Sequence, residues 1–427
     1  MKIGIVGAGF TGLAAAYYLS KEGHKVTIIE MGEKPGGLAI GYKEKEWDWT
    51  LEEHYHHWFT NDFSVLDLAK EIGYEVIIKR PKTSNFVENG IYQLDSPISL
   101  LKFPKLSLPN RIRMGASLAL LRYNFFWKPF EFFKAEPYLK LSMGEEGYKK
   151  LWKPLMDNKL GEYAKVVSLA WFWSRVYKRT PSLAYPKGGF LNFAKALEKK
   201  IEEQGGKFIY NSKVTNLESN KKIKISFQKN DKKRIEHLEF DKALVTSPIP
   251  IFAKIAPSLP ASYVDKYTKL QGIGAINLVI RFKKPFLPDD TYWLSMTEGK
   301  SPILAIVEHT NFMDNKGYNN EHIVYFGNYM PASDPRFSMN EDQILKLYDP
   351  WLKKINPKYK DAIISKKLFK AAFAQPIITT NHSKKIPPMT TPLKNVYLAN
   401  IQQVYPWDRG TNYAVELGKK VSNLILS

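Results

Sequence analysis

The sequence predicts an α/β protein in which a domain built on a parallel sheet is interleaved with a second, α+β domain. The first thirty residues have the order strand, glycine-rich turn, helix, strand and acid, which is typical of a Rossmann-like unit. At 427 residues the chain is too long for one small core, so two domains are expected. Strand and helix patterns that suit the first domain also return in the middle and at the end of the chain.

The first unit begins with residues 2–6, a short apolar run of strand type, and continues with the glycine-rich residues 7–12. Residues 13–21 are rich in Ala and Leu and predict a helix. Residues 25–30 are a second β-branched run that ends in Glu30. The unit therefore places an acid at the tip of its second strand.

The residue types in this unit suit a dinucleotide. Gly7 permits a tight turn, Gly9 lets the backbone approach a pyrophosphate, and Gly12 lets the helix pack closely on the sheet. The helix N-terminus offers unpaired N–H groups to the phosphates. Glu30 can accept hydrogen bonds from a ribose and disfavours a 2′-phosphate, so FAD or NAD fits better than NADP. The residues expected to line the nucleotide here are Gly7, Gly9, Phe10, Thr11, Gly12, Glu30 and Met31.

A second glycine pair, Gly36-Gly37, follows the acid in the stretch from Met31 to Leu38. With this pair the sequence resembles the FAD-binding superfamily of flavin amine oxidases, protoporphyrinogen oxidases and phytoene desaturases, over essentially its full length. The resemblance implies an amine-oxidase/glutathione-reductase-like two-domain fold, with FAD favoured as the cofactor over NAD. It also implies that Gly36, Gly37 and Leu38 lie close to the FAD pyrophosphate and ribityl chain.

On this basis we expect the Rossmann-like FAD-binding domain to be formed by residues 1–59, 186–250 and 390–427. We expect residues 60–185 and 251–389 to form the interleaved α+β substrate-binding domain.

The formal net charge is +21, from 63 Lys and Arg against 42 Asp and Glu, and there are no cysteines. The positive charge favours an anionic small-molecule substrate or an anionic membrane surface as a partner, although a generally lysine-rich composition explains it as well. No nucleic-acid-binding motif occurs, so no nucleic acid partner is expected. The absence of cysteine removes disulfides, thiolate nucleophiles and cysteine-bound zinc. The sequence leaves the oligomeric state open.

Residue 1 lies almost directly before the first strand, so we expect no signal peptide and a cytoplasmic protein. No run of eighteen uncharged apolar residues predicts a membrane span. Residues 98–140 nevertheless mix large aromatic side chains with Lys and Arg. This mixture suits peripheral association with anionic lipid at the inner face of the membrane, while helical core packing explains the same pattern.

Acidic, histidine and aromatic side chains are concentrated in residues 46–59. The histidines have no downstream His or Cys partner at a familiar metal-binding spacing, so no metal site is expected. The family resemblance implies that this stretch passes the flavin ring. We therefore expect proton transfer or substrate orientation from this cluster, although a purely structural polar loop remains open. The candidate catalytic residues are Glu53, His54, His56 and His57.

Residues 147–181 resemble the bacterial protoporphyrinogen-oxidase-like flavoproteins of unassigned substrate. Trp171 offers a stacking face, and Lys159, Arg175 and Arg179 are donors suited to a carboxylate or a phosphate; core anchors and surface ion pairs are the open alternative. The candidate substrate-binding residues of the whole chain are Trp171, Arg175, Tyr185, Gly188, Tyr405 and Arg409.

The chain then returns to the first domain with a predicted helix over 191–204 and a strand over 207–214. The family resemblance implies that Val214 binds the adenine through its backbone and that Ser247 touches the nucleotide. Further strands are predicted over 275–281, 303–308 and 322–327 and a helix over 341–355. Together they indicate an antiparallel or mixed sheet above a substrate cavity.

The last segment carries a second specific signal. In the resembled superfamily, a Gly followed by an acid binds the ribityl chain, and the next helix points its N-terminus at the pyrimidine end of the flavin. This sequence departs from that pattern because Ala399-Asn400 replaces the Gly and the acid, although Asn400 can still hydrogen-bond a hydroxyl. Gly410, Thr411 and Asn412 begin the predicted final helix and are expected beside the flavin.

These features predict an FAD-dependent oxidoreductase that removes a hydride from a C–C or C–N bond of a hydrophobic or anionic substrate. Its electrons would pass to oxygen, a quinone or another acceptor. One alternative is a non-redox isomerase resembling UDP-galactopyranose mutase, which uses reduced FAD on a sugar nucleotide. Another is a non-catalytic binder of lipid or lipidated protein with the same fold, which the intact glycine motifs disfavour.

Overall fold

The computed structural model describes residues 1–230, 234–299 and 301–427. Its first layer is a five-stranded sheet in the order β10, β2, β1, β14, β20, and every neighbouring pair is parallel. All five strands lie inside the three ranges expected for the FAD-binding domain, so the chain returns to this sheet twice. The strands are β1 Lys2–Val6, β2 Lys25–Ile29, β10 Lys207–Ile209, β14 Lys242–Val245 and β20 Val396–Leu398.

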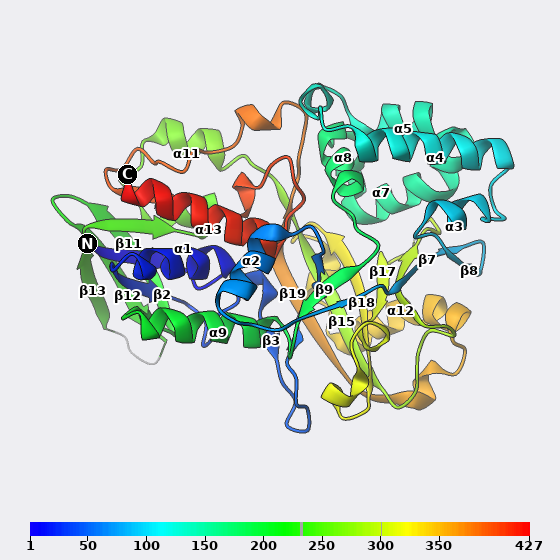
Figure 1. The fold of residues 1–427 in the computed structure, drawn as a ribbon, viewed down its shortest axis with the longest axis horizontal. Coiled ribbons are helices and arrows are strands. Elements are labelled where there is room, and N and C mark those ends of the chain that lie inside the picture. The colour runs from blue at the N-terminus through cyan, green and yellow to red at the C-terminus, as the bar shows by residue number, and fades with distance from the viewer. Residues whose placement is uncertain (231–233, 300) are drawn as a thin grey trace.

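Helix α1 (Phe10–Lys21) lies between α13 (Thr411–Leu426) and α9 (Phe190–Glu203) (Figure 1). Small side chains permit this packing. A β-carbon on Gly418 of α13 would lie 2.6 Å from the backbone oxygen of Thr11 in α1, so only glycine lets the two helices come this close. The last helix of the chain is therefore fixed directly against the first.

The second layer is a seven-stranded sheet in the order β19, β15, β18, β17, β16, β7, β8. Its pairs are antiparallel except for β16 with β7, which are parallel. The mixed sheet expected from the sequence is therefore present. The strands are β7 Lys82–Val87, β8 Gly90–Gln93, β15 Gly272–Phe282, β16 Thr291–Met296, β17 Ala305–Glu308, β18 His322–Met330 and β19 Ile363–Pro376.

Helices cover this second layer from different sides (Figure 1). Helix α12 (Glu341–Ile355) buries Ile344, Tyr348 and Leu352 in a cluster with side chains of the sheet. A helical region in cyan and teal lies beyond the opposite end of the sheet and is made by one continuous stretch of chain. Its helices are α3 Pro97–Leu101, α4 Leu108–Tyr123, α5 Ala135–Met143, α6 Glu145–Gly147, α7 Lys153–Leu160 and α8 Leu169–Tyr177.

Smaller elements complete the fold. Strands β11 (Ser212–Ser219), β12 (Ile223–Lys229) and β13 (Ile235–Phe240) form an antiparallel sheet at the end that carries the N-terminus (Figure 1). The remaining strands are β3 Gly41–Tyr42, β4 Leu51–Glu52, β5 Trp58–Phe59, β6 Val76–Lys79 and β9 Leu183–Pro186; the remaining α-helices are α2 Phe63–Glu71, α10 Ile249–Ile255 and α11 Ala261–Tyr267.

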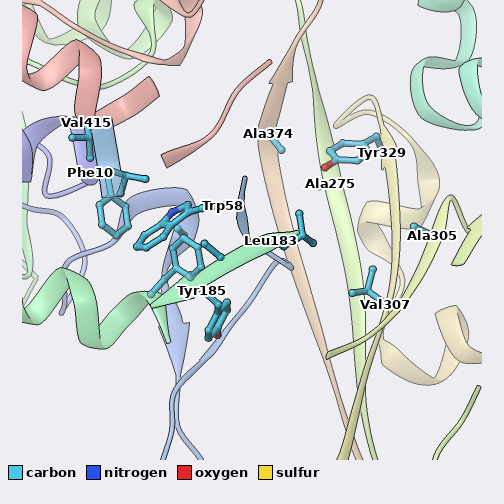
Figure 2. Packing of buried hydrophobic residues seen from close by; sticks show 14 of the residues in the cluster. Phe10, Trp58, Leu183, Tyr185, Ala275, Ala305, Val307, Tyr329, Ala374 and Val415 are labelled. Atoms are coloured by element: carbon cyan, nitrogen blue, oxygen red, sulfur yellow. The ribbon is translucent and has the colours of Figure 1, made fainter. Parts of the chain in front are cut away.

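One hydrophobic core joins the two layers. Phe10 of α1, Trp58 of β5 and Tyr185 of β9 gather where the layers meet, and Ala275, Ala374 and Tyr329 line the neighbouring part of the large sheet (Figure 2). The two sets belong to the same cluster of buried residues. The seven-stranded sheet is therefore packed onto the parallel-sheet layer through side chains rather than connected by a linker alone.

Two sequence expectations for the fold need correction. The strand expected over 207–214 is two strands, because Asn211 adopts a left-handed φ of 52° and turns the chain out of the parallel sheet. Val214 consequently lies in β11, at the edge of another sheet. Strands β7, β16 and β19 were not expected, because their sequences do not alternate cleanly between apolar and polar residues.

Within the described part of the chain, no helix is long and apolar enough to cross a membrane.

Candidate functional site

The glycine turn after β1 has the geometry that its sequence predicts. Gly7 has a φ of 105°, and a β-carbon on Gly12 would lie 2.1 Å from the Gly7 backbone oxygen. The N-cap of α1 is Gly9, which provides no side-chain hydrogen bond to the first turn. Since Phe10 and Thr11 begin this helix, their backbone N–H groups remain able to bind an anion.

The second glycine pair lies directly on the first turn. Gly36 donates its N–H to the Ala8 carbonyl at 3.0 Å and forms an isolated parallel bridge with Gly9. Gly36 and Gly37 have φ of 132° and 60°, and a β-carbon on Gly37 would lie 2.9 Å from the Gly9 α-carbon. Two glycine loops thus make one smooth backbone cradle in which any side chain would intrude.

Glu30 fastens this cradle to β2. Its carboxylate accepts the N–H of Ala8 and the N–H of Gly32, each at 2.7 Å. Each carboxylate oxygen keeps a further lone pair for a ribose hydroxyl. Met31 and Leu38, on either side of the second loop, are exposed. Large apolar side chains exposed beside a glycine cradle are what a ligand would cover.

The remaining cofactor candidates lie at the ends of other strands. Val214 is buried on edge strand β11, and the Ser247 hydroxyl is buried without a hydrogen-bond partner in the described residues. Asn400 is already engaged, because its amide nitrogen donates to the Ser247 carbonyl at 2.8 Å and its amide oxygen accepts the N–H of Gln402 at 2.9 Å. Its expected contact with a ribityl hydroxyl stays a prediction.

The start of α13 is held by hydrogen bonds from β5 and α2 to the side chains of Thr411 and Asn412. Trp58 donates its indole N–H to the Thr411 hydroxyl at 2.6 Å, and the Val65 N–H donates to the Asn412 side-chain oxygen at 3.1 Å. The N-cap, Gly410, is exposed and supplies no capping side chain. The first N–H groups of α13 therefore remain available to a polar ligand.

A cavity opens between the second glycine loop and the residues just before α13. Leu38 and Arg409 both line it, together with residues of strands β15, β18 and β19. The lining residues are Leu38, His54, Tyr55, His56, Ala275, Asn277, Tyr329, Ala371, Ala374 and Arg409. The cavity thus brings together two of the four candidate catalytic residues and one substrate candidate.

The cavity histidines are neutral hydrogen-bonding groups. His56 Nδ1 donates to the His54 carbonyl, which leaves Nε2 of a neutral His56 as an acceptor. Asn277 donates to His54 Nδ1. Burial lowers the pKa of His54 to about 3 and that of His56 to about 4. These rings favour orientation of a substrate over storage of a proton at neutral pH.

His57 and Glu53 do not line this cavity. His57 Nδ1 lies 3.1 Å from the Tyr292 hydroxyl, and burial lowers its pKa to about 3. Glu53 is half-buried, and burial raises its pKa. Of the four candidates, His54 and His56 therefore line the cavity, and the expected roles of Glu53 and His57 stay predictions.

The neighbouring acid, Glu52, was not among the candidates expected from the sequence, and it is completely buried. Tyr185 donates its hydroxyl to both Glu52 oxygens, at 3.0 and 2.8 Å, and the Phe190 N–H donates at 2.8 Å. Burial raises the Glu52 pKa to about 7. Tyr185, expected to bind substrate, instead lies in the core with its hydroxyl committed to this carboxyl (Figure 2).

Two more substrate candidates have structural partners. The Gly188 carbonyl accepts the N–H and the hydroxyl of Thr50 at 3.0 and 2.9 Å. Tyr405 donates to Glu131 at 2.8 Å. Neither residue lines the cavity.

Cationic candidates gather beside the cavity. Arg175 forms an ion pair with Asp408 and lies 5.1 Å above the ring of the buried Trp171. Arg409 donates to the Tyr329 hydroxyl and to the Gln375 side-chain oxygen. Asn277 and Tyr55 were not among the candidates, although Asn277 gave one signal as a polar residue within an apolar strand.

The arrangement fits FAD. The glycine cradle leaves no room for side chains, Glu30 keeps free lone pairs, and two helix N-termini lack side-chain caps. The buried Ser247 hydroxyl supplies an unpaired polar atom at the same edge of the sheet. In the described ranges, no group of three His, Asp or Glu side chains is placed to hold a metal ion.

Comparison with known proteins gives one family. The family described as flavin-containing amine oxidoreductase matches residues 10–426. The coproporphyrinogen III oxidase of Staphylococcus aureus is 26% identical over 326 residues, which cover 66% of this chain and 67% of that protein.

Two solved structures share the whole fold. An oxidoreductase from Methanosarcina mazei is 19% identical with a TM-score of 0.76, covering 99% of this chain and 100% of the other. Reduced UDP-galactopyranose mutase is 16% identical with a TM-score of 0.75, covering 99% and 96%. At these identities the likeness shows the fold alone.

Proposed function

The chain belongs to the family of flavin-containing amine oxidoreductases, with FAD as its cofactor, and from this premise we propose that it oxidises a small organic molecule by removing a hydride from a C–C or C–N bond. The observation that carries the proposal is the cavity between the second glycine loop and Arg409. A substrate there would lie next to the segment that passes the flavin in this family. The electrons then pass to oxygen, a quinone or another acceptor.

When bound, FAD supplies the hydride acceptor, while the protein positions the substrate and sets the local charge. Gly9, Gly36 and Gly37 would hold its pyrophosphate through the backbone, and Glu30 would hold a ribose. Thr411 and Asn412 would place the N-terminus of α13 beside the flavin, where the helix dipole stabilises added negative charge.

The cavity residues would then orient the substrate. His56 Nε2 can accept a hydrogen bond from a substrate N–H or O–H group. Since the lowered pKa values keep His54 and His56 uncharged at neutral pH, they add no positive charge that would oppose departure of a hydride. Ala275, Ala371 and Ala374 present small apolar side chains to the cavity.

One alternative has its own support. A non-redox isomerase acting on a sugar nucleotide through reduced FAD is consistent with the cations beside the cavity, and a mutase of this kind shares the fold. A non-catalytic lipid or lipidated-protein binder has less support, since the glycine cradle for FAD is intact.

The test is a visible spectrum of the purified protein, followed by anaerobic mixing with hydrophobic amines, polyenes, porphyrinogens and sugar nucleotides. Flavin bands that bleach with one substrate class would support the oxidoreductase and identify its chemistry. Sugar-nucleotide isomerisation that appears only after dithionite reduction would replace it with the isomerase. A protein purified without flavin would contradict both.

A further inference from the structure

Four cationic side chains surround a single carboxylate next to the cavity. Arg175 is paired with Asp408, and the next residue, Arg409, points its guanidinium 5.1 Å from the centre of the Tyr329 ring. The Lys159 ammonium lies over the same ring at 4.3 Å. Arg179 follows α8 two residues after its end. With all four charged, the cluster carries three positive charges more than Asp408 balances.

Two of these cations form no direct ion pair within the described residues. Neither Lys159 nor Arg179 donates a hydrogen bond there; Lys159 contacts the Tyr329 ring, and both interact with the charge of Asp408 only at longer range. Arg179 is exposed, yet burial among protein atoms and the charge of Arg175 lower its pKa to about 10.

The cluster is unfavourable in the free protein. Burial and then the neighbouring guanidinium of Arg175 hold the Lys159 pKa well below its usual value. Unpaired cations held together in a protein repel one another and cost free energy. An oxyanion between them would relieve this repulsion and would form charge-assisted hydrogen bonds.

Tyr329 connects the cluster to the cavity. Its ring contacts Lys159 and Arg409, its hydroxyl accepts from Arg409, and it lines the cavity with Arg409. A molecule with its reacting carbon in the cavity can therefore place an attached group among the cations.

We propose that Lys159, Arg175, Arg179 and Arg409 form a subsite that binds an oxyanion group of the substrate, a carboxylate or a phosphate. This inference rests on the proposed function, because it takes the cavity to be the substrate site. It also sets a specificity: an aliphatic amine, which is a cation at neutral pH, is repelled here unless it also carries an acid group.

The test measures binding to the oxidised holoenzyme by perturbation of the flavin spectrum, so that it needs no turnover. Succinate, inorganic phosphate, succinamide and 1,4-diaminobutane are the probes. Succinate or phosphate should bind. The neutral succinamide and the cationic 1,4-diaminobutane should bind at least about 10-fold more weakly, since a hydrogen bond to a charged group contributes about that factor to the affinity. The stronger of the two anions identifies carboxylate or phosphate as the natural group.

Arg179→Gln and Lys159→Gln should each weaken anion binding about 10-fold or more. Lys153→Gln is the matched control, because this exposed lysine of α7 is paired with Asp157. Equal binding of diamine and anion, or unchanged anion affinity in both cluster variants, would overturn the subsite. Failure of the flavin to bleach with any substrate would count against the proposed function alone.

A second surface, formed by helix α4 and the loop after it, exposes large apolar side chains. Helix α4 is apolar on two faces: Met114 and Leu121 are buried against the protein, while Leu120 and Tyr123 are 69% and 81% exposed. The outward face also contains Leu108 and Ile112, both exposed.

The loop after α4 continues the outward face. Phe125 and Phe126 are each 68% exposed and pack on one another at 4.5 Å between ring centres. Phe132 and Phe133 follow, also exposed. So large an uncovered apolar surface on one segment indicates an interaction site.

The charges around this surface are strongly positive. Residues 98–141 contain two acids, Glu131 and Glu136, and both are held by internal hydrogen bonds from tyrosine. The same residues contain eight cations, namely Lys102, Lys105, Arg111, Arg113, Arg122, Lys128, Lys134 and Lys140. Three of them form ion pairs, Lys105 with Glu88, Lys128 with Glu131 and Lys140 with Glu136, so the surplus of positive charge comes from the other five.

From this charge complementarity we infer that the outward face of α4 and the loop over 125–133 rest on an anionic lipid bilayer. The aromatic side chains would enter the headgroup layer while the lysines bind lipid phosphates and carboxylates. The attachment is peripheral, since it rests on side chains inserted from one helix face and a loop.

Co-sedimentation of the holoenzyme with vesicles tests this. Phosphatidylcholine vesicles that contain about 30 mol% phosphatidylserine should bind the protein, and pure phosphatidylcholine vesicles should bind it much less. Because salt screens the attraction between the lysines and the lipid, about 0.5 M NaCl should release the protein. Phe125→Ser with Phe126→Ser should weaken binding about 10-fold or more.

Ile235→Ser on β13, also an exposed apolar residue, is the matched control and should bind as the wild type does. Equal binding to both vesicle types, or unchanged binding of the double variant, would overturn the membrane surface. The proposal would also be overturned if light scattering showed that the wild type is a dimer and the double variant a monomer, while vesicles bound neither protein.

Discussion

Glu52 offers a sharp test of how this core is built, because its carboxyl group is buried among tyrosines without a cation. Tyr185 and the Phe190 N–H donate to it, and Tyr325 donates to its backbone carbonyl at 2.7 Å. The hydrogen bonds from Tyr185 and Phe190 favour the charged form, but burial outweighs them and raises the pKa of Glu52 to about 7. The substitution Glu52→Gln removes the charge and preserves the size.

The direction of the pH dependence follows from the linkage between proton binding and folding. A carboxyl with a raised pKa stabilises the fold fully below its unfolded pKa of about 4.5 and loses that contribution as the pH rises through about 7. A shift of this size corresponds to about 3 kcal/mol, of which about 2 kcal/mol are lost between pH 5.5 and pH 8. The glutamine variant carries no such loss.

We therefore expect the free energy of unfolding of Glu52→Gln, relative to the wild type, to rise by about 2 kcal/mol from pH 5.5 to pH 8. Urea titrations followed by tryptophan fluorescence at several pH values measure this difference. The buried histidines titrate with the opposite sign, but they are common to both proteins and cancel. Glu239→Gln on β13, an exposed glutamate, is the control, and a difference that stays constant with pH would refute the reasoning.

Three further outcomes are expected. Gly12→Ala should cost more than about 2 kcal/mol of stability and impair FAD retention, because the added β-carbon would collide with the Gly7 backbone. Gly115→Ala, in open helical surroundings, should instead stabilise the protein by up to about 1 kcal/mol. Urea titration measures the stability of both variants, and the flavin content measures FAD retention. Asn400→Asp should destabilise by about 1–3 kcal/mol, because an acid cannot donate to the Ser247 carbonyl, and equal stability in urea would contradict this. His56→Ala should keep its flavin and slow its reduction about 10-fold in stopped flow, with no change in pH profile between 6 and 8 since the ring is neutral there.

The parallel-sheet domain was accessible from sequence because its elements are local and strongly patterned. The strand, glycine turn and helix follow one another within residues 1–30, and glycine spacing constrains them more than propensity does. The edge strand of the second sheet could not be predicted in this way. Strand β19 carries Lys366, Lys367 and Lys370 among its apolar residues, and such lysines are typical of edge strands, where they obscure the alternation on which prediction depends.

A buried polar pair inside the sheet obscured the sequence pattern of two other strands, β7 and β16. Ser84 of β7 and Thr291 of β16 are fully buried and hydrogen-bond to each other at 2.9 Å. Neither residue signals a buried position on its own, because a hydroxyl is tolerated in a core only when its partner is present. That partner lies 207 residues away, beyond what a local pattern can show.

The candidate site divides in the same way. Glycine and acid motifs locate the FAD cradle, since each residue acts through its own backbone or a near neighbour. The choice between Glu52 and Glu53 depended on which one faces the core, and two adjacent acids give no local signal for that. Lys159 of α7 and Arg409 just before α13 were identified singly, but their common position beside Tyr329 is a property of the tertiary fold.

Asn400 shows why a departure from a family pattern need not mean a damaged site. In this chain its amide nitrogen donates to the Ser247 carbonyl, and its oxygen caps the turn that leads toward Arg409. An aspartate could keep the cap but would face a carbonyl with no proton to offer. The asparagine therefore joins the strand end of β14 to the segment that delivers Asp408 and Arg409 to the cavity. If Asn400→Asp lowered anion affinity together with stability, that coupling would be established; loss of stability alone would confine Asn400 to the fold.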